Sequence, residues 1–252
     1  EAMIGGAISC NASGFIPGEK GAMRYWVNGL DIVLPNGEFL RIKRGQYISE
    51  NGQFDLIMSD GTSTVIKIPS YKRVNLKNAS GPFSSSDGIM DLIDLFIGSE
   101  GIFGCITKAL LSLDVKPKNY LNLFIKFKNE SEAFDFNSYI RKYLNNNMSN
   151  LKAFEYFGEN CFDFMDDRDY LFDEIYNVGI YIQIPIFEDN KDMVISEWHN
   201  TLMNFDYIIN DNQILSLDDP ISWKKFFRAR HSIPANALQK SKKYRTASII
   251  TD

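Results

Sequence analysis

Apolar residues are spaced most regularly in the second half of the chain, after Pro117. Leu121, Leu123, Ile125 and Phe127 occupy every second position, which is the period of a β-strand. Similar patterns predict strands over residues 151–157, 178–186 and 214–217 and helices over residues 129–144, 191–204 and 223–230. The acidic and aromatic stretch over residues 161–176 is also expected to be helical. Strands and helices in this succession predict a ferredoxin-like α+β layer.

The first half of the chain is dominated by patterns typical of hairpins. Apolar residues alternate over residues 30–34, and the pair Asn36-Gly37 favours a tight turn. Residues 39–42 are predicted to form the second strand of this hairpin. A second hairpin is predicted with strands over residues 54–58 and 64–68 and a turn at Asp60-Gly61. Further along, a helix-like apolar run over residues 89–97 is followed by a strand-like run over residues 106–113.

The composition is that of a folded protein with a modest negative charge. Of the 252 residues, 44% are hydrophobic, and 27 basic residues against 32 acidic ones give a net charge of −5. A basic surface is the requirement for non-specific nucleic-acid binding, so this class of function is disfavoured. We expect the basic residues Arg41, Lys43 and Arg44 to lie on a solvated strand edge, where charges prevent edge-to-edge aggregation.

Cysteine usage and hydropathy bear on the compartment. Cys10, Cys105 and Cys161 are odd in number and far apart, so neither a disulfide framework nor a zinc site is predicted. A reducing compartment, the cytoplasm, is therefore favoured. No apolar run approaches the roughly 18 residues of a membrane span, and no signal peptide is recognisable.

The stretch over residues 94–107 reads Asp-Leu-Phe-Ile-Gly-Ser-Glu-Gly-Ile-Phe-Gly-Cys-Ile-Thr. Gly98, Gly101 and Gly104 lie at the junction of the helix-like and strand-like runs. Because glycine has no Cβ, its backbone adopts positive φ and lets a ligand approach closely. The spacing alone is consistent with a loop whose amides face a phosphate and with an ordinary helix-to-strand turn.

The identity of these residues is more specific than their spacing. Asp-Leu-Phe-Ile-Gly-Ser-Glu-Gly-x-x-Gly-x-Ile-Thr closely resembles the signature of the FAD-linked oxidases of the vanillyl-alcohol oxidase type, also called the PCMH type. That family includes D-lactate dehydrogenases, glycolate oxidase flavoprotein subunits and alkyl-dihydroxyacetonephosphate synthases. Residues 5–14, Gly-Gly-x-x-x-x-Asn-Ala-Ser-Gly, resemble its motif around the FAD pyrophosphate, although the residues alone also allow a glycine-rich turn.

Two further stretches resemble the family with departures. Over residues 20–38, Tyr25 stands where an acid is usual and Lys20 where an aromatic residue is usual. Residues 77–82 resemble the family's Lys-Asn-x-x-Gly, but Pro82 replaces the aromatic residue that follows, which in the family lies on the flavin side of the pocket.

The resemblance implies that FAD is the cofactor and that the two glycine-rich stretches cradle it, mostly through backbone amides. The residues implied as cofactor-binding are Gly5, Gly6, Asn11, Ala12, Ser13, Gly14, Glu100, Gly101, Ile102, Phe103, Gly104, Cys105 and Ile106.

The implied architecture is α+β with two domains. Residues 1–116 correspond to the second subdomain of a PCMH-type FAD-binding domain, and residues 117–252 to a ferredoxin-like cap or substrate domain that is incomplete at its end. The family's first FAD subdomain and its His-rich catalytic motif find no match in these residues. We therefore expect the chain to be part of a longer protein and the catalytic residues to lie outside it.

One substrate contact is implied within the cap. Residues 223–231 resemble the family's Leu-Trp-x-x-Arg stretch, and residues 154–156 resemble a cap strand with a central glutamate. The resemblance implies that Arg230, in preference to Arg228, faces the substrate carboxylate, which suits the bidentate fork of a guanidinium. The alternative is a basic helix end that complements the helix dipole.

Metal and triad chemistry receive no support from the sequence. The acidic stretch over residues 163–169 lacks the glycine and the closing acid of a calcium loop. His199 and His231 have no evident serine or cysteine nucleophile as a partner.

Two classes of function remain open. In the first, the whole protein is an FAD-linked oxidoreductase that transfers a hydride from a 2-hydroxy acid, such as D-lactate or glycolate, to flavin N5 and passes electrons to an acceptor that the sequence does not identify. The non-redox alkyl transfer of the ether-lipid synthases is a variant within the family. In the second, the chain is a flavin-free scaffold or binding module. In either case the expected location is the cytoplasm. The oxidoreductase could also attach to the surface of a membrane through its electron acceptor.

Overall fold

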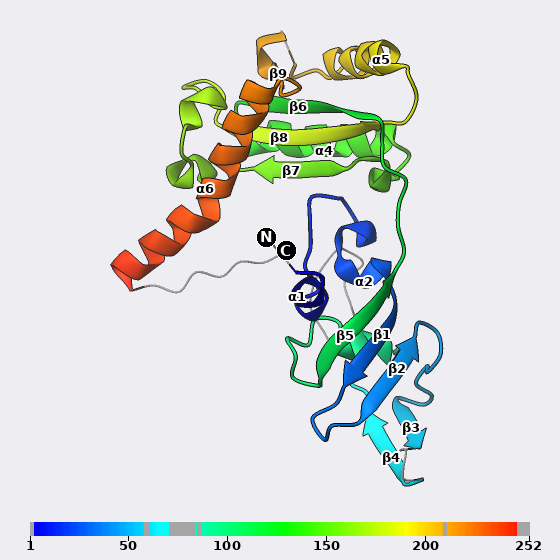
Figure 1. Cartoon of the computed structure of the whole chain (residues 1–252). Helices are drawn as coiled ribbons and strands as arrows, with labels where there is room; N and C mark the ends of the chain where they lie inside the picture. Colours follow the sequence, from blue (N-terminus) through cyan, green and yellow to red (C-terminus); the bar gives the residue numbers. More distant parts are fainter. Residues whose placement is uncertain (1–2, 58–60, 71–83, 85–86, 209–210, 246–252) are drawn as a thin grey trace. The chain divides into compact units, whose positions relative to one another are not determined.

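The computed structural model describes residues 3–57, 61–70, 84, 87–208 and 211–245, which combine helices and strands. These residues form two compact units (Figure 1). Unit 1 comprises residues 3–14 and 18–114, and unit 2 comprises residues 15–17 and 115–245. The chain passes from unit 1 to unit 2 close to residue 117, but no pattern in the sequence indicated that residues 15–17 pack with unit 2.

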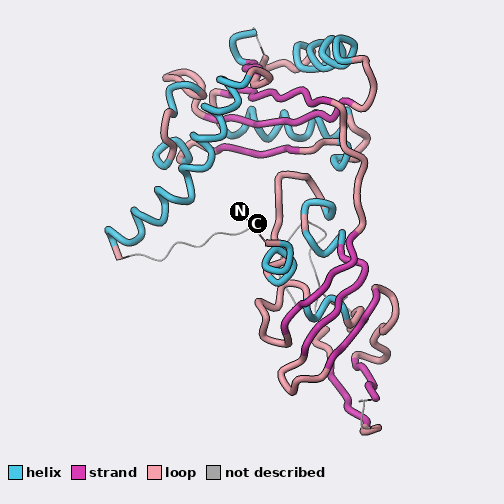
Figure 2. The backbone as a smooth tube through the Cα atoms, viewed as in Figure 1, coloured by secondary structure: helices cyan, strands magenta, loops and turns pink. Residues whose placement is uncertain are grey.

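Unit 1 is built on antiparallel strands. Its elements are α1 (Ile4–Ser9), η1 (Glu19–Gly21), α2 (Met23–Trp26), β1 (Val27–Val33), β2 (Phe39–Lys43), β3 (Gln53–Ile57), β4 (Ser63–Lys67), α3 (Ile93–Phe96) and β5 (Cys105–Leu111). The strand order is β2-β1-β5, and β3 pairs with β4 in a separate two-stranded sheet (Figure 2). Leu30 and Ile32 on β1 and Ile93 on α3 belong to the buried core.

Both predicted hairpins are confirmed. β1 and β2 pair antiparallel, and the register places Leu30 opposite Ile42. β3 and β4 also pair antiparallel, with Gly61 in the connection at a φ of 81° and residues 58–60 outside the described part of the chain. Local turn chemistry and a period-two pattern were sufficient signals because each hairpin closes over a short stretch of sequence.

The prediction for the first residues was wrong in its secondary structure. Residues 4–9 form α1 rather than the glycine-rich turn that the residues alone allow. Intrinsic propensity does not favour a helix with two glycines, but tertiary contacts override it. At the end of this helix the carbonyls of Ile8 and Ser9 accept hydrogen bonds from the amides of Gly98 and Glu100, and the Ile8 carbonyl also accepts one from the amide of Asn11.

The helix expected over residues 89–97 is also wrong in extent, since α3 covers only Ile93–Phe96. The preceding backbone bonds across to a distant loop: Ser49 N donates to the carbonyl of Met90, and Leu92 N donates to the carbonyl of Tyr47. These groups are therefore not available for a helical turn.

The basic run at the end of β2 divides in two. Arg41 is exposed and pairs with Asp31, and this hydrogen bond lowers the pKa of the Asp31 carboxyl. Lys43 is exposed as expected. Arg44 contradicts the prediction, because its guanidinium turns inward and binds the buried carboxylate of Asp94.

Unit 2 is a four-stranded antiparallel sheet with helices. Its elements are β6 (Asn119–Phe127), α4 (Glu130–Tyr143), η2 (Met148–Asn150), β7 (Ala153–Phe157), η3 (Cys161–Phe164), η4 (Arg168–Tyr170), β8 (Val178–Ile186), α5 (Lys191–Met203), η5 (Asp211–Gln213), β9 (Ile214–Ser216) and α6 (Pro220–Tyr244). The strand order is β7-β8-β6-β9. The succession along the chain is strand, helix, strand, strand, helix, strand, followed by α6.

The sheet of unit 2 is covered on both faces. Leu123 and Ile125 on β6 pack in a core with residues of α4 and α5, whereas Phe124 between them packs with Phe226 and Ala229 of α6. Figure 1 accordingly shows α6 crossing the opposite side of the sheet from α4. Coverage of both faces explains why β6 and β8 are apolar at nearly every position in their middle.

The helix predicted from residue 129 is confirmed as α4. Asn129 is its N-cap and accepts a hydrogen bond from the amide of Glu132. The helix ends before Asn145 and Asn146, which both have left-handed backbones, with φ of 51° and 61°.

Two helical predictions in unit 2 differ from the structure. Residues 161–176 contain only the short η3 and η4, and Asp167 between them has a left-handed φ of 55° that interrupts any longer helix. The helix predicted over residues 223–230 lies in the first half of the longer α6 (Pro220–Tyr244), which has Asp219 as N-cap and Pro220 in its first turn.

One glycine fixes the packing on the α6 side of the sheet. A Cβ built on Gly179 of β8 would overlap the ring of Phe124, which other aromatic rings surround. We expect Gly179→Ala to lower the free energy of unfolding by about 1–3 kcal/mol through overpacking. Urea denaturation measures this, and the loss should shrink in a Phe124→Leu background.

Gly14→Ala is the matched control, because a Cβ built there meets nothing within 4 Å. An unchanged unfolding midpoint for Gly179→Ala would contradict the packing of Phe124 on β8.

Candidate functional site

The two glycine-rich stretches of unit 1 line one open hollow with a volume of about 620 Å³. From the first stretch, Gly5 and Gly6 line it. From the second, it is lined by Gly101, Gly104, Cys105 and Ile106. Stretches more than ninety positions apart in the sequence therefore form the wall of a single site.

Backbone hydrogen bonds hold the two stretches together. Gly98 N donates to the carbonyl of Ile8 at 3.0 Å, and Glu100 N donates to the carbonyl of Ser9 at 2.8 Å. The end of α1 is thus attached to the start of the glycine loop, and β5 follows that loop directly.

The loop requires glycine for two separate reasons. Gly98 and Gly101 have φ of 81° and 82°, in the left-handed region that favours glycine. At Gly104 the reason is close approach: a built Cβ would lie 2.7 Å from Ile32 Cγ2 and 2.8 Å from the carbonyl oxygen of Val33. At Gly101 a built Cβ meets nothing within 4 Å, so this position faces open space.

The segment after α1 does not line the hollow. Asn11 is buried and left-handed, with a φ of 46°, and its side-chain oxygen accepts a hydrogen bond from Arg24 N. Ala12 N donates to the carbonyl of Ala7, which completes the end of α1. Ser13 and Gly14 pair with residues 21–22. These residues hold the end of α1 in place and do not line the hollow, so their contact with a cofactor stays a prediction.

The second stretch also contributes fewer lining residues than predicted. Glu100, Ile102 and Phe103 are not among the residues that line the hollow. Glu100 instead takes a left-handed φ of 53° and donates its amide to Ser9.

Four lining residues were missed by sequence reasoning, namely Ser9, Val33, Leu34 and Pro35. Val33 lies opposite Cys105 in the pairing of β1 with β5, so the end of β1 reaches the loop. The register of strands far apart in sequence leaves no local signal, and only the turn at Asn36-Gly37 indicated where β1 ends.

None of the residues lining the hollow carries a charged side chain. Its polar groups are backbone amides and carbonyls, the hydroxyl of Ser9 and the thiol of Cys105. Such a wall suits a ligand that is recognised through the backbone. In the described part of the chain, no group of three His, Cys, Asp or Glu residues is arranged to hold a metal ion. Residues 77–82 lie outside the described residues.

In unit 2, Arg230 is already paired. Its guanidinium donates to both carboxylate oxygens of Glu155, at 2.7 and 2.8 Å, and lies 4.0 Å from the ring centroid of Phe15. The structure thus brings together the two cap stretches singled out in the sequence. Arg228 points elsewhere and pairs with Asp167 at 3.4 Å.

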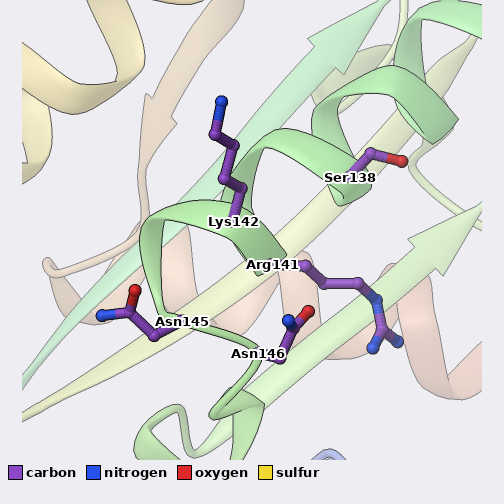
Figure 3. A pocket seen from close by; sticks show the side chains of 5 residues that line it. All are labelled: Ser138, Arg141, Lys142, Asn145 and Asn146. Carbon is purple, nitrogen blue, oxygen red and sulfur yellow. The ribbon is translucent and has the colours of Figure 1, made fainter.

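A second hollow, of about 490 Å³, lies at the end of α4. Ser138, Arg141, Lys142, Asn145 and Asn146 line it, and Figure 3 shows the Arg141 and Lys142 side chains leaving the helix in different directions. Their charges do not converge on one point, so the arrangement defines no anion site.

No helix among the described residues is both long and apolar enough to cross a membrane.

Comparison with known proteins gives partial matches. The chain is 28% identical to a D-lactate dehydrogenase of Anaerostipes hadrus over 128 residues, which are 51% of this chain and 19% of that protein. It is 30% identical to a D-2-hydroxyglutarate dehydrogenase of Stutzerimonas stutzeri strain A1501 over 122 residues, 48% of this chain and 18% of that protein. It is 26% identical to the glycolate oxidase subunit GlcD of Bacillus subtilis strain 168 over 130 residues, 52% of this chain and 20% of that protein.

The matched part spans no more than a fifth of these relatives. No family model matches the chain. Among solved structures, an alkyldihydroxyacetonephosphate synthase aligns with a TM-score of 0.49 and 13% identity over 84% of this chain and 33% of that one, a likeness too low to support an argument. The signature motifs and the sequence matches agree: over about half of its length the chain is similar to FAD-linked dehydrogenases and oxidases of the vanillyl-alcohol oxidase type.

Proposed function

We propose that the whole protein is an FAD-dependent oxidoreductase acting on a 2-hydroxy acid and that the hollow of unit 1 holds part of its FAD. The observation that carries the proposal is the convergence of two motifs, each matched to the family separately, on one hollow. The flavin-free scaffold is the competing hypothesis.

The residues present fit a cofactor that is held by backbone. Gly5, Gly6 and Gly101 border space in which a built Cβ meets nothing within 4 Å. A volume of about 620 Å³ is also within the range of small-molecule sites.

When bound, FAD supplies the hydride acceptor at its flavin ring. The chain's own residues hold and orient the cofactor. Gly5, Gly6 and Gly101 would hold it through their backbone, and the apolar side chains of Val33 and Ile106 would exclude water from it.

The two units have separate proposed roles. Unit 1 corresponds to the second subdomain of a PCMH-type FAD-binding domain. Unit 2 corresponds to a ferredoxin-like cap, because its strand order β7-β8-β6-β9 with two intervening helices is a split β-α-β arrangement.

The proposed substrate class rests on the names of the relatives. D-Lactate, D-2-hydroxyglutarate and glycolate, which those names contain, are all 2-hydroxy acids. The alternative within the family, a non-redox alkyl transfer, has support only from the motifs that the whole family shares. Anaerobic mixing of the longer protein with a 2-hydroxy acid distinguishes the two reactions. An oxidoreductase oxidises the substrate and reduces the flavin, which loses its visible absorption, whereas alkyl transfer causes no net reduction of the flavin.

Gly101 provides a direct test of the glycine loop. A β-branched side chain at a φ of 82° is strained by about 1–2 kcal/mol and would occupy the open space. We expect Gly101→Val to abolish flavin retention in the full-length protein, measured by visible absorption, while the protein stays folded.

Gly61→Val is the matched control, since Gly61 has nearly the same φ of 81° but lies in the β3–β4 turn. It should show the same strain with unchanged flavin. Full flavin content in Gly101→Val would remove this loop from the site.

The three cysteines offer a test that does not depend on turnover. Cys105 and Cys10 are both exposed, but only Cys105 lines the hollow. Burial raises the pKa of the Cys161 thiol to about 12, so it carries almost no thiolate near pH 8. We expect FAD to slow alkylation of Cys105 severalfold, to leave Cys10 unchanged and Cys161 slow throughout. Mass spectrometry follows each site, and equal rates at Cys105 with and without saturating FAD would place the cofactor elsewhere.

Arg230 is proposed to bind the substrate carboxylate. The substrate would then compete with the Glu155 carboxylate for the Arg230 guanidinium. We expect Arg230→Ala to raise the KM for the 2-hydroxy acid about tenfold or more, the value of a charge-assisted bidentate contact. Arg228→Ala, from the same helix and paired with Asp167, is the control and should leave KM unchanged.

A double-mutant cycle, read together with the KM of Arg230→Ala, distinguishes a purely structural role of Arg230 from a role in substrate binding. The side chains of Arg230 and Glu155 are only 24% and 28% exposed, so a coupling of about 1 kcal/mol in stability is expected in either case. Coupling together with an unchanged KM for Arg230→Ala would make Arg230 a structural residue alone.

A further inference from the structure

A buried arginine connects the two stretches that line the hollow. Arg24 on α2 is 7% exposed. Its Nη1 donates to the Asp94 carbonyl at 3.0 Å and lies 2.9 Å from that residue's carboxylate, and its Nη2 donates to the carbonyl of Ile97 at 2.9 Å. Its backbone amide donates to the side-chain oxygen of Asn11 at 2.9 Å.

These contacts hold each stretch at or beside a residue with a left-handed backbone. Asn11 is the left-handed residue just after α1, and Ile97 is the residue just before the left-handed Gly98. The packing there is close, since a Cβ built on Gly98 would lie 3.2 Å from Asn11 Cβ and 3.7 Å from Arg24 Nη2. Arg24 therefore contacts both segments within a few residues of the positions that line the hollow.

We propose that Arg24 is a positioning residue for the cofactor loops. Its guanidinium holds the start of the glycine loop at Ile97, and its main-chain amide binds Asn11 at the end of α1. The side chain thus sets the glycine loop, with Gly101, relative to Gly5 and Gly6. The proposal rests on the proposed function for the cofactor itself. The effect of Arg24 on the order of the two loops can be measured in the absence of cofactor.

Only an arginine satisfies all of these acceptors. A planar guanidinium donates in several fixed directions, whereas an ammonium group is a single point of charge. Here the fork binds a carboxylate and two carbonyls that the end of α3 leaves without helical partners.

Arg44 provides a matched comparison within the same cluster. It donates to both carboxylate oxygens of Asp94 at 3.0 Å, to the carbonyl of Val27 at 2.8 Å and to the carbonyl of Arg24 at 3.1 Å. None of these acceptors lies in residues 4–14 or 97–106. Loss of Arg44 therefore weakens the same ion pair without removing a contact to either stretch.

The experiment compares Arg24→Ala, Arg24→Lys and Arg44→Ala in the full chain. Hydrogen exchange followed by mass spectrometry reports on peptides covering residues 4–14 and 97–106, with the β3–β4 hairpin as an internal reference. We expect Arg24→Ala to speed exchange about tenfold or more in the peptide over residues 97–106 and by less in the peptide over residues 4–14, because the main-chain bond to Asn11 remains. Arg44→Ala should speed exchange in either peptide by less than about threefold, even where the two variants lose similar thermal stability. Arg24→Lys should fall between them, and it replaces Arg24→Ala in the comparison if the alanine variant does not fold.

FAD titration is the second readout. The dissociation constant should rise about tenfold or more for Arg24→Ala and remain within about threefold of wild type for Arg44→Ala. If the wild-type chain and the longer protein both fail to bind FAD, the proposed function fails, while the exchange result still decides the positioning role. Equal exchange in the Arg24 and Arg44 variants, or an unchanged rate in the Arg24 variants, would overturn it.

Discussion

The candidate site depends on how closely β5 approaches β1 at Gly104. No side chain fits there, because Ile32 and the carbonyl of Val33 occupy the space that a Cβ would need. This approach sets Cys105 opposite Val33 and brings the end of β1 to the glycine loop. The loop in turn supplies the amides that complete α1. The hollow thus exists because three segments with little local preference for their conformations satisfy one another's backbone groups.

The cluster around Asp94 shows how this arrangement is kept rigid. Burying a carboxylate and a guanidinium group, as at Asp94 and Arg24, is costly unless each finds partners, and a partly satisfied cluster destabilises a fold. Here Asp94 is 4% exposed and accepts from both Arg24 and Arg44. Most remaining donors of these arginines are used on main-chain carbonyls, so the electrostatic contacts also define backbone positions. A cluster of this kind adds more to the specificity of the loop geometry than to net stability.

Sequence reasoning succeeded where the determinants are local. The pairs of alternating strands around Asn36-Gly37 and Asp60-Gly61 and the cap at Asn129 each depend on residues a few positions apart. The glycine loop was identified because positive φ and close approach both exclude other residues. Reasoning failed where the partner is distant: α1 is completed by amides some ninety positions away, and Arg44 turns toward Asp94 fifty positions on. Phe15 joins unit 2 through its contact with Arg230, which no local pattern signals.

A scaffold and a cofactor site make different demands on α1. Glycine within a helix is less favourable than alanine by about 1 kcal/mol, so two in succession need a reason. Neither Gly5 nor Gly6 has a positive φ, and a Cβ built on either would meet nothing within 4 Å. The fold therefore gains nothing from the missing side chains, in contrast to Gly104, whose absent Cβ the packing requires. What the two glycines do provide is bare backbone along one wall of the hollow. This is useful only if a ligand comes close to it, and for this reason we favour the cofactor site over the flavin-free scaffold.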